Sequence, residues 1–345
     1  MKEARFITKL LISRTDGIGD VVLTLPLAGL IKAQHPDLHI AFLGQPYTRA
    51  VIEACGFIDE FIDWQQISEL LPDDQVIALR QENFDAIIHV FPRKGIAQLA
   101  KKAGIPCRIG TTGRLFHWFT CNRLVFLTRR RSRLHEAQLN VKLGKRLIKS
   151  DEISEKEISQ LYGLNRVEML PETLLHQLSS DKFNLILHPK SKGSAREWGS
   201  VNFAALSAML PREKYNIIIT GTQQEGELLR KEDFFVKAGD VLDLTGQMSL
   251  AEMISFIHAS DGLVAASTGP LHLAAALGKV ALGLYPPLRP MHPGRWKPLG
   301  KHAGFLVAEK ECEACRHSGS CACMLSITPL QVKNKLDSMV FNYLQ

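Results

Sequence analysis

Short apolar runs alternate with stretches of helical spacing along most of the chain. In the first half the predicted elements are, in order, strand 7–13, helix 20–34, strand 39–43, helix 48–55, strand 61–64, helix 67–81, strand 86–91 and helix 96–103. Strands that alternate with helices in this way predict a parallel sheet covered by helices on both faces. Pro26 lies inside the first helical stretch, so we expect a kink or a restart there.

The same alternation returns in the second half, after a polar and mixed stretch at 150–181. Between the two halves we expect a loop-like passage around Arg114 and Trp118, a strand at 124–127 and a helix at 135–149. The later predicted strands are 184–188, 216–220, 241–244, 262–266 and 280–284, and helices are predicted at 201–210, 225–235, 249–259 and 267–278. Because 345 residues exceed one ordinary core, we predict two domains, 1–170 and 171–328. A last amphipathic helix within 329–345 can pack back across the cleft between them.

Composition narrows the possible partners only partly. The formal charge is +7 and the pI is near 9.0, which suits an anionic ligand, an anionic membrane face or nucleic acid. No helix-turn-helix, zinc-finger or stacking-aromatic motif is recognisable, so nucleic acid ranks last. No run reaches transmembrane length, and the N-terminus lacks the pattern of a signal peptide. We therefore expect a cytoplasmic protein.

The first predicted strand is followed by two glycines and a carboxylate. Gly17 and Gly19 allow close approach of the backbone, and Asp20 stands at the entrance of a helix, whose dipole stabilises a negative charge. An ionised carboxylate at the end of a strand can act as a general base. Helix capping is the commoner role for Asp at such a position, so both interpretations stay open.

Basic residues follow two later strands of the first half. Arg93 and Lys94 lie just after strand 86–91, where open sheets bind ligands. The run Arg129-Arg130-Arg131-Ser132-Arg133 follows strand 124–127. Such a run is usually a solvated face, although its position also permits contact with an anionic acceptor or with lipid headgroups.

The turn after strand 262–266 has the sequence Ser267-Thr268-Gly269-Pro270-Leu271-His272. Ser267 or Thr268 can cap the following helix, Pro270 suits its first turn, and Gly278 can end it. Such a helix start binds anions, and His272 lies close enough to reach a phosphate oxygen. The alternative is an ordinary strand–turn–helix unit with a surface His.

A basic loop and a carboxylate follow two other strands of the second half. Lys190, Lys192 and Arg196 can supply positive charge to a diphosphate, or can be ordinary surface residues. Glu225, after strand 216–220, can accept hydrogen bonds from both hydroxyls of a ribose or can simply favour a helix start. Their combination with the Ser267 turn suits nucleotide binding.

Four cysteines cluster near the C-terminus. The spacing of Cys312, Cys315, Cys321 and Cys323 has roughly the density of a zinc site, although the second half of the pattern is unusual. Tetrahedral structural zinc and plain reduced thiols both fit this pattern.

Taken together, these motifs resemble the bacterial heptosyltransferases of glycosyltransferase family 9, which build the lipopolysaccharide inner core of Gram-negative bacteria. The resemblance covers nearly the whole chain, and it rests on the segments 17–26, 196–198, 221–225 and 267–278. It implies an α/β chain of GT-B fold, in which two Rossmann-like doubly wound domains face a central cleft. The acceptor then binds the N-terminal half and ADP-heptose binds the C-terminal half.

The resemblance also implies roles for single residues. Asp20 matches the catalytic base of an inverting displacement, with Gly19, Arg93 and Lys94 on the acceptor side. On the donor side it implies these residues: Lys190, Lys192, Arg196, Glu225, Ser267, Thr268, Gly269 and His272. No cofactor is required, because basic side chains and a helix dipole can stabilise departing ADP. Two positions depart from the family pattern: Ser267 replaces a frequent Asp, and Lys190 replaces a frequent Gly.

We therefore expect transfer of a heptose or related sugar from ADP-heptose to an anionic lipid-linked acceptor such as Kdo–lipid A. The basic residues would hold the enzyme at the cytoplasmic face of the inner membrane without an anchor, and no nucleic acid is involved. The alternatives are a sugar-nucleotide epimerase or hydrolase of the same fold, and a non-catalytic relative that binds nucleotide sugar or lipopolysaccharide precursors.

Overall fold

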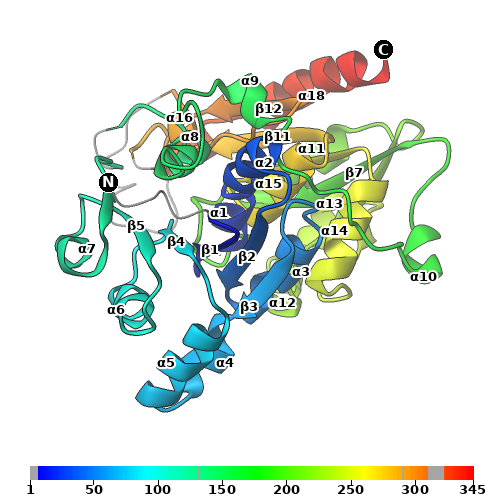
Figure 1. Cartoon of the computed structure of the whole chain (residues 1–345). Coiled ribbons are helices and arrows are strands. Elements are labelled where there is room, and N and C mark those ends of the chain that lie inside the picture. The colour runs from blue at the N-terminus through cyan, green and yellow to red at the C-terminus, as the bar shows by residue number, and fades with distance from the viewer. Residues whose placement is uncertain (1–6, 130–131, 290, 310–321) are drawn as a thin grey trace. The chain divides into compact units, whose positions relative to one another are not determined.

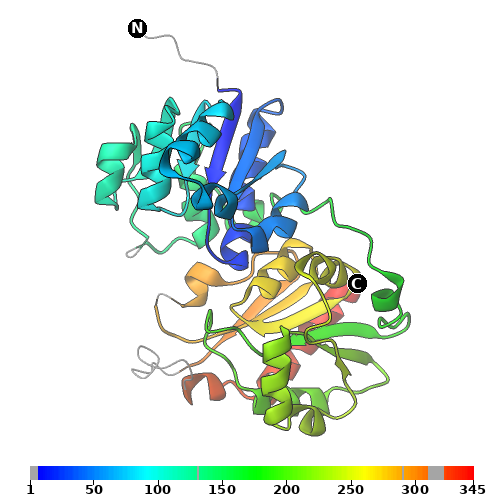
Figure 2. The same ribbon diagram turned by 90° about the horizontal axis from the view of Figure 1, so that it is seen from below.

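The chain divides into two units, each built on its own sheet. The computed structural model describes residues 7–129, 132–289, 291–309 and 322–345. The units are Met1–Arg166 and Val167–Gln345, whereas the sequence placed the boundary after residue 170. Each unit contains a six-stranded parallel sheet with helices packed on it (Figures 1 and 2). The predicted α/β class with two doubly wound sheets is confirmed.

The first unit alternates strands and helices from its start. Its elements are β1 (Lys9–Ser13), α1 (Ile18–Val22), α2 (Leu25–Gln34), β2 (His39–Gly44), the 3-10 turn η1 (Pro46–Thr48), α3 (Arg49–Glu53), β3 (Glu60–Asp63), α4 (Trp64–Glu69), α5 (Pro72–Gln81), β4 (Ala86–His89), α6 (Lys94–Lys102), β5 (Cys107–Thr111), α7 (Leu115–Thr120), β6 (Arg123–Val125), α8 (Glu136–Leu143) and α9 (Glu155–Ile158). The strand order is β3-β2-β1-β4-β5-β6. Apolar residues of β1, β2 and β4 form its core with one face of α6.

Prolines explain two differences from the predicted helices of this unit. The helix predicted at 20–34 is two helices, and Pro26 lies in the first turn of the second, so it marks a restart. The helix predicted at 67–81 also breaks, because the residue before Pro72 is held in an extended conformation.

The loop-like passage expected around Trp118 is wrong, because α7 forms there. It buries His117 and Thr120 while it exposes Leu115, Trp118 and Phe119. Most of its large apolar side chains therefore point outward, and polar residues occupy the buried face. The spacing of buried apolar residues that usually predicts a helix is absent.

The second unit repeats the alternation. Its elements are α10 (Glu172–Leu175), β7 (Phe183–His188), α11 (Ser200–Met209), β8 (Tyr215–Ile219), α12 (Gln223–Lys231), α13 (Phe234–Ala238), β9 (Leu242–Asp243), α14 (Leu250–Ala259), β10 (Gly262–Ala266), α15 (Gly269–Ala276), β11 (Val280–Tyr285), α16 (Pro293–Trp296), β12 (Ala303–Val307), α17 (Ala322–Leu325) and α18 (Pro329–Leu344). The strand order is β12-β11-β10-β7-β8-β9.

Local capping explains several helix starts in this unit. Ser249 and Glu252 cap α14 reciprocally, as their spacing predicts, and Thr222 and Glu225 do the same for α12. The helix predicted at 225–235 breaks at Asp233, which adopts a left-handed conformation with φ of 53°.

The last helix, α18, belongs to the core of the second unit. Val332, Leu336 and Val340 are buried in the same apolar cluster as Trp198 and Phe203. Within the described residues, every helix is too short or too polar to cross a bilayer.

Both sheets reverse their strand order at the same relative place. In the first unit β1 pairs with both β2 and β4, and in the second β7 pairs with both β8 and β10. Successive strands are therefore added on one side and then on the other. In open parallel sheets, ligands bind at this switch point, beyond the carboxyl ends of the strands. The loops after β1 and β4, and those after β7 and β10, thus mark two candidate sites.

Candidate functional site

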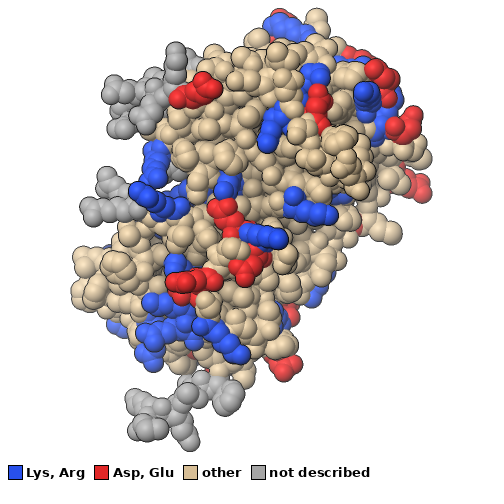
Figure 3. Space-filling model, turned by 90° about the horizontal axis from the view of Figure 1, so that it is seen from above, with Lys and Arg blue, Asp and Glu red and all other residues tan. Residues whose placement is uncertain are grey.

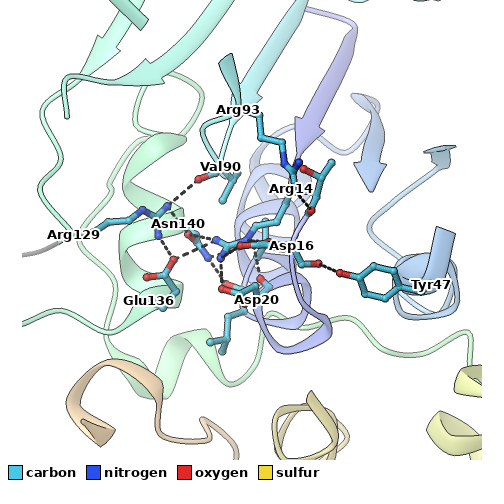
Figure 4. Close-up of polar contacts among 12 residues, drawn as sticks. Arg14, Asp16, Asp20, Tyr47, Val90, Arg93, Arg129, Glu136 and Asn140 are labelled. Atoms are coloured by element: carbon cyan, nitrogen blue, oxygen red, sulfur yellow. Dashed lines mark hydrogen bonds and ion pairs between the residues drawn. The ribbon is translucent and has the colours of Figure 1, made fainter. Parts of the chain in front are cut away.

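Arg14 is the centre of the first candidate site. It follows β1 directly, and its side chain is only 3% exposed. Its Nε and Nη2 donate to the carboxylate of Asp16 at 2.8 and 3.1 Å, and Nη2 also pairs with Asp20 (Figure 4). Its Nη1 donates to Glu136 at 3.2 Å and to Asn140 at 3.1 Å. One guanidinium therefore holds the carboxylate of Asp16, in the loop after β1, and that of Asp20, in α1, and joins both to α8.

Arg129 completes this network from the other side. It pairs with Glu136 and donates to Asn140 Oδ1 and to the Val90 carbonyl, both at 3.1 Å (Figure 4). Glu136 is 1% exposed and lies between two guanidinium groups, which compensate the cost of burying its charge. Arg129 thus points inward, which corrects the interpretation of this residue as part of a solvated or lipid-facing run.

Asp20 lies in the first turn of α1. Gly17, at the N-cap, provides no side-chain cap, so the carboxylate of Asp20 stands beside the open end of the helix. Thr24 Oγ1 donates to the Asp20 carbonyl at 2.8 Å, and Asn140 Nδ2 donates to Thr24 Oγ1 at 3.3 Å. The side chain of Asp20 stays 28% exposed. A fixed and partly exposed carboxylate can accept a proton from a bound ligand.

The neighbouring Asp16 has a different environment. Burial raises the pKa of its carboxyl, and the charge of Asp20 adds to this effect, while Arg14 opposes it. The Asp16 carbonyl accepts a hydrogen bond from Tyr47 at 2.9 Å (Figure 4). Asp16 in the loop and Asp20 in α1 are thus both partly exposed, at 20% and 28%, and both contact Arg14.

The three residues expected on the acceptor side lie after β1 and β4, and their role in acceptor binding stays a prediction. Gly19 precedes Asp20 in α1, and Arg93, at the N-cap of α6, donates to the Thr15 carbonyl at 3.0 Å. Lys94 is the first residue of α6, and both basic side chains are exposed. The loops after β1 and β4 therefore bring Arg93 to the loop that contains Asp16 and precedes Asp20.

Several buried polar atoms at this switch point have no hydrogen-bond partner within the described residues. They are Ser13 Oγ, Thr15 Oγ1 and both ring nitrogens of His89. Ser13 and His89 are partners in the register between β1 and β4. Burial and the nearby charges of His117 and Arg108 lower the pKa of His89 to about 3, so its ring is neutral at physiological pH. Such orphaned groups are costly in a folded chain and are typical of ligand sites.

The second candidate site lies where β10 meets α15. Thr268 is the N-cap of α15, but its hydroxyl makes no capping bond and has no partner within the described part of the chain. His272, in the first turn, is 3% exposed, and its Nδ1 is likewise without a partner there. Burial lowers the pKa of His272 to about 4. A helix start with two unused polar side-chain atoms is suited to an anionic group.

Ser267 and Gly269 flank Thr268 in this turn. The Ser267 side chain lies near the hydroxyl of Tyr285, which donates to the Trp296 carbonyl at 2.6 Å. Gly269 is the first residue of α15. The hydroxyl that replaces the frequent family Asp therefore lies beside a buried tyrosine of β11.

The three basic residues after β7 differ in their surroundings. Lys190 pairs with Glu232, at 2.8 Å, and with Glu197, at 3.8 Å. Lys192 is exposed and left-handed, with φ of 48°, and Arg196 is half-buried in the same loop. Lys190 thus already has two internal carboxylate partners.

Glu225 is also used internally. It is 5% exposed, and its Oε2 accepts hydrogen bonds from Thr222 N at 2.7 Å and Thr222 Oγ1 at 2.9 Å. Burial of the His188 ring lowers the pKa of that histidine, and the charge of Glu225 opposes this effect. Glu225 therefore combines helix capping with a place beside the end of β7.

The cysteine cluster lies largely outside the described residues. Cys312, Cys315 and Cys321 fall in the segment 310–321, whereas Cys323 is buried in the core of the second unit. In the described ranges, no group of three or more His, Cys, Asp or Glu side chains is placed to hold a metal ion. The predicted structural zinc stays a prediction.

Sequence reasoning missed most of the network around Asp20. Arg14 and Asp16 directly follow a predicted strand, and their position at its carboxyl end was a usable signal. Glu136 and Asn140 come from α8, more than 100 residues later, and no local pattern connects them to Asp20.

Comparison with known proteins places these sites in a family context. The family model of glycosyltransferase family 9 (heptosyltransferase) matches residues 76–324. A protein of Haemophilus influenzae named "Putative glycosyltransferase" is 28% identical over 320 residues, which cover 86% of this chain and 88% of that protein.

Solved structures share the fold over nearly the full length. The Escherichia coli ADP-heptose LPS heptosyltransferase II has a TM-score of 0.75 at 19% identity, covering 98% of this chain and all of that one. A family 9 glycosyltransferase of Veillonella parvula has a TM-score of 0.76 at 18% identity, with 97% of each chain covered. The E. coli heptosyltransferase WaaC, solved with ADP, has a TM-score of 0.69 at 19% identity, covering 96% and 99%.

These likenesses extend to both doubly wound sheets, and the family match covers more than half of the sequence. The chain belongs to glycosyltransferase family 9, the heptosyltransferase family.

Proposed function

We propose that this glycosyltransferase transfers a heptose, or a related sugar, from ADP-heptose to a lipid-linked acceptor of the lipopolysaccharide inner core, such as Kdo–lipid A. The observation that supports this most is the pair of candidate sites at equivalent switch points. One contains a fixed carboxylate, Asp20, and the other a helix start with unused polar groups at Thr268 and His272.

The donor is assigned to the second unit. Thr268 Oγ1, His272 Nδ1 and the first N–H groups of α15 suit the oxygens of a diphosphate, and Lys192 and Arg196 add positive charge from the loop after β7. The structural relative WaaC was solved with ADP and with ADP-2-deoxy-2-fluoro heptose. We propose the same class of donor for this chain.

The acceptor and the base are assigned to the first unit. Asp20 takes the proton of the attacking acceptor hydroxyl as that oxygen forms a bond to the anomeric carbon. The bond between this carbon and the diphosphate oxygen breaks, and ADP leaves with its electron pair. A single displacement of this kind inverts the anomeric configuration.

The ion pair with Arg14 has a defined part in this mechanism. It holds the Asp20 carboxylate in a fixed position, from which that group can accept the proton of a bound hydroxyl. Basic side chains and the α15 dipole stabilise the departing ADP, so we propose that transfer needs no divalent metal. The enzyme would act peripherally at the cytoplasmic face of the inner membrane.

The test is a transfer assay with ADP-heptose and Kdo–lipid A in excess EDTA, comparing wild type with Asp20→Asn. We expect the variant to lose at least about a hundredfold in kcat, because it retains shape and loses the base. ADP binding, measured by calorimetry, should be unchanged. Asp74→Asn is the matched control, since Asp74 also lies in the first turn of a helix, α5, and is exposed.

Each other outcome identifies an alternative. Tight ADP-heptose binding without product in the wild type would favour a binding-only relative or a different acceptor. Turnover of donor without acceptor would favour an epimerase or hydrolase. Equal activity of Asp20→Asn and wild type would exclude Asp20 as the base.

A further inference from the structure

The positive charge of the chain is concentrated in one segment. Between Ala86 and His135 there are eleven Lys and Arg residues and no Asp or Glu. The whole chain has a formal charge of +7, so the remainder is net negative. The segment runs from β4 through α6, β5, α7 and β6 to the residue before α8. In the space-filling view, Lys and Arg side chains gather in groups, some beside uncharged surface (Figure 3).

The same segment exposes large apolar side chains. On α7, Leu115 is 76% exposed, Trp118 58% and Phe119 70%. Their spacing, i, i+3 and i+4, places them on one face of the helix. Phe126, just after β6, is 80% exposed. We call these four side chains the α7 apolar patch.

Backbone and side-chain contacts fix α7 beside the basic residues. It packs against α6, at the periphery of the first unit (Figure 1). Lys101 Nζ, from α6, donates to the Phe119 carbonyl at 2.9 Å, and Arg108 Nε donates to the Thr120 carbonyl at 2.7 Å. The last turn of α7 is therefore held between two cations.

Trp118 is oriented by a bond of its own. Its indole N–H donates to the Thr112 carbonyl at 3.1 Å, so its polar atom is satisfied within the protein while most of the side chain remains exposed. The backbone beside it is tied to β6, because Thr112 N donates to the Val125 carbonyl at 3.0 Å. Phe126 directly follows Val125 in the sequence. Through Thr112, the backbone next to Phe126 is therefore linked to the Trp118 side chain.

We propose that the α7 apolar patch and its surrounding basic residues are the surface by which the enzyme docks on an anionic lipid bilayer. This inference deepens the proposed function and rests on it, because a lipid-linked acceptor requires the enzyme to work at a membrane. Apolar side chains enter the headgroup and acyl boundary, and the basic residues bind anionic headgroups. Arg114, the N-cap of α7, and Arg123, the first residue of β6, are exposed and can bind anionic headgroups.

The chemistry favours a bilayer over the other anionic partners. Leu115 has no aromatic face, so it adds nothing to stacking on nucleic-acid bases, whereas it adds to insertion into lipid. The absence of acidic residues over the whole segment matches an extended anionic surface rather than one compact ligand. The exposed apolar side chains and the basic residues are both needed, because stable peripheral binding to a bilayer combines apolar insertion with electrostatic attraction.

The test measures sedimentation of the purified full-length protein with vesicles that contain neither acceptor nor donor. We expect binding to phosphatidylcholine vesicles with about one-third phosphatidylglycerol, weak binding to phosphatidylcholine alone, and release by high salt. Leu115→Ser/Phe119→Ser should lower the partition coefficient at least about tenfold. Arg114→Gln/Arg123→Gln should lower it about thirtyfold, from about fivefold for each basic residue beside an anionic surface.

Matched controls distinguish the patch from general effects of exposed residues. Leu71→Ser/Phe341→Ser removes a comparably exposed Leu and Phe, and Lys214→Gln/Lys231→Gln removes two exposed cations of the second unit. Both controls should bind vesicles like the wild type. All four variants should transfer sugar normally to a detergent-solubilised acceptor, which separates a failure of docking from a failure of the proposed activity.

Three results would overturn the docking proposal. The first is that the wild type does not bind anionic vesicles. The second is that the patch variants bind vesicles as well as their controls. The third is that the patch binds a single-stranded oligonucleotide more tightly than it binds the vesicles. None of these results would affect the assay of Asp20.

Discussion

At the scale of single residues, the proposed donor site is distinguished by buried polar atoms without a hydrogen-bond partner in the described residues. Thr268 buries a hydroxyl without a partner in the described residues, which costs about 1–3 kcal/mol of folding free energy. A residue that destabilises the folded chain in this way is explained most simply by a ligand that supplies the missing partner.

Replacement of Thr268 by Val tests this explanation. The two side chains have similar shape, so Thr268→Val should raise the free energy of unfolding by about 1 kcal/mol and weaken ADP binding about tenfold. Urea denaturation and calorimetry measure the two effects. In the control Thr111→Val, a hydroxyl bonded to the Leu127 carbonyl at 3.0 Å is lost, so stability should fall and ADP binding should persist. Unchanged ADP affinity in Thr268→Val would remove Thr268 from the donor site.

His272 gives the pH dependence of stability a defined sign. Burial lowers its pKa to about 4 in the folded chain, against about 6.5 when unfolded. Between these values the unfolded state binds more protons, so stability falls as pH decreases from 7 toward 4.

When the pH falls from 7 to 5, the free energy of unfolding of His272→Gln should therefore decrease by about 2 kcal/mol less than that of the wild type. Denaturation curves at the two pH values measure this difference. The contributions of the other buried histidines to the pH dependence cancel, because both proteins contain those residues. If the stabilities of the two proteins depended on pH in the same way, the His272 ring would be protonated equally in the folded and unfolded states.

Individual site residues were predictable to different degrees. Asp20, Thr268 and His272 sit at ends of strands that the sequence shows clearly, and resemblance to a family assigned them roles. Glu136 and Arg129 were not predictable, because their value depends on contacts with Arg14 and Val90 that only the folded sheet creates. Lys190 was predictable as a loop cation, but its pairing with Glu232 across 42 residues was not.

At the scale of elements, close packing decides which glycines are replaceable. A Cβ on Gly29, inside α2, would lie 2.5 Å from the Leu161 carbonyl oxygen and 3.0 Å from the Phe57 ring. A Cβ on Gly95, in α6, would meet nothing within 4 Å.

We therefore expect opposite effects from the same substitution. Gly95→Ala should stabilise the protein by about 0.5 kcal/mol, since Ala favours the helix. Gly29→Ala should destabilise it by about 1–3 kcal/mol, because overpacking outweighs the gain in propensity. Urea midpoints of the two variants check this, and a stabilised Gly29→Ala would show that α2 can move away from Leu161.

Most strands were predictable because buried parallel strands read as continuous apolar runs. The helix break before α2 was predictable, because Pro26 marks it in the sequence, whereas the break at Asp233 depends on a left-handed backbone conformation inside an otherwise helical pattern. Helix α7 was missed for another reason: its apolar face is exposed, so the usual relation between apolar spacing and burial does not apply.

At the scale of the whole molecule, charge is distributed by segment rather than evenly. The net charge of +7 arises from one stretch of fifty residues, Ala86 to His135, in the first unit. A total charge alone favours no particular partner. This distribution, together with the α7 apolar patch, places the proposed attraction to an anionic bilayer at the β6 edge of the first sheet. The overall composition could not show this, because the negative remainder of the chain conceals it.

The two sheets place their first and fourth strands at the same relative position, so each unit presents two loops at its switch point. These loops differ in length and charge, while the sheets that support them keep one topology. We expect such a chain to evolve as a pair of interchangeable modules. Under the proposed assignment of donor and acceptor, changes at 189–198 or 267–269 would alter which sugar nucleotide is bound, and changes at 14–17 or 90–93 would alter which acceptor is modified. Each choice could then be inherited, or engineered, without disturbing the other.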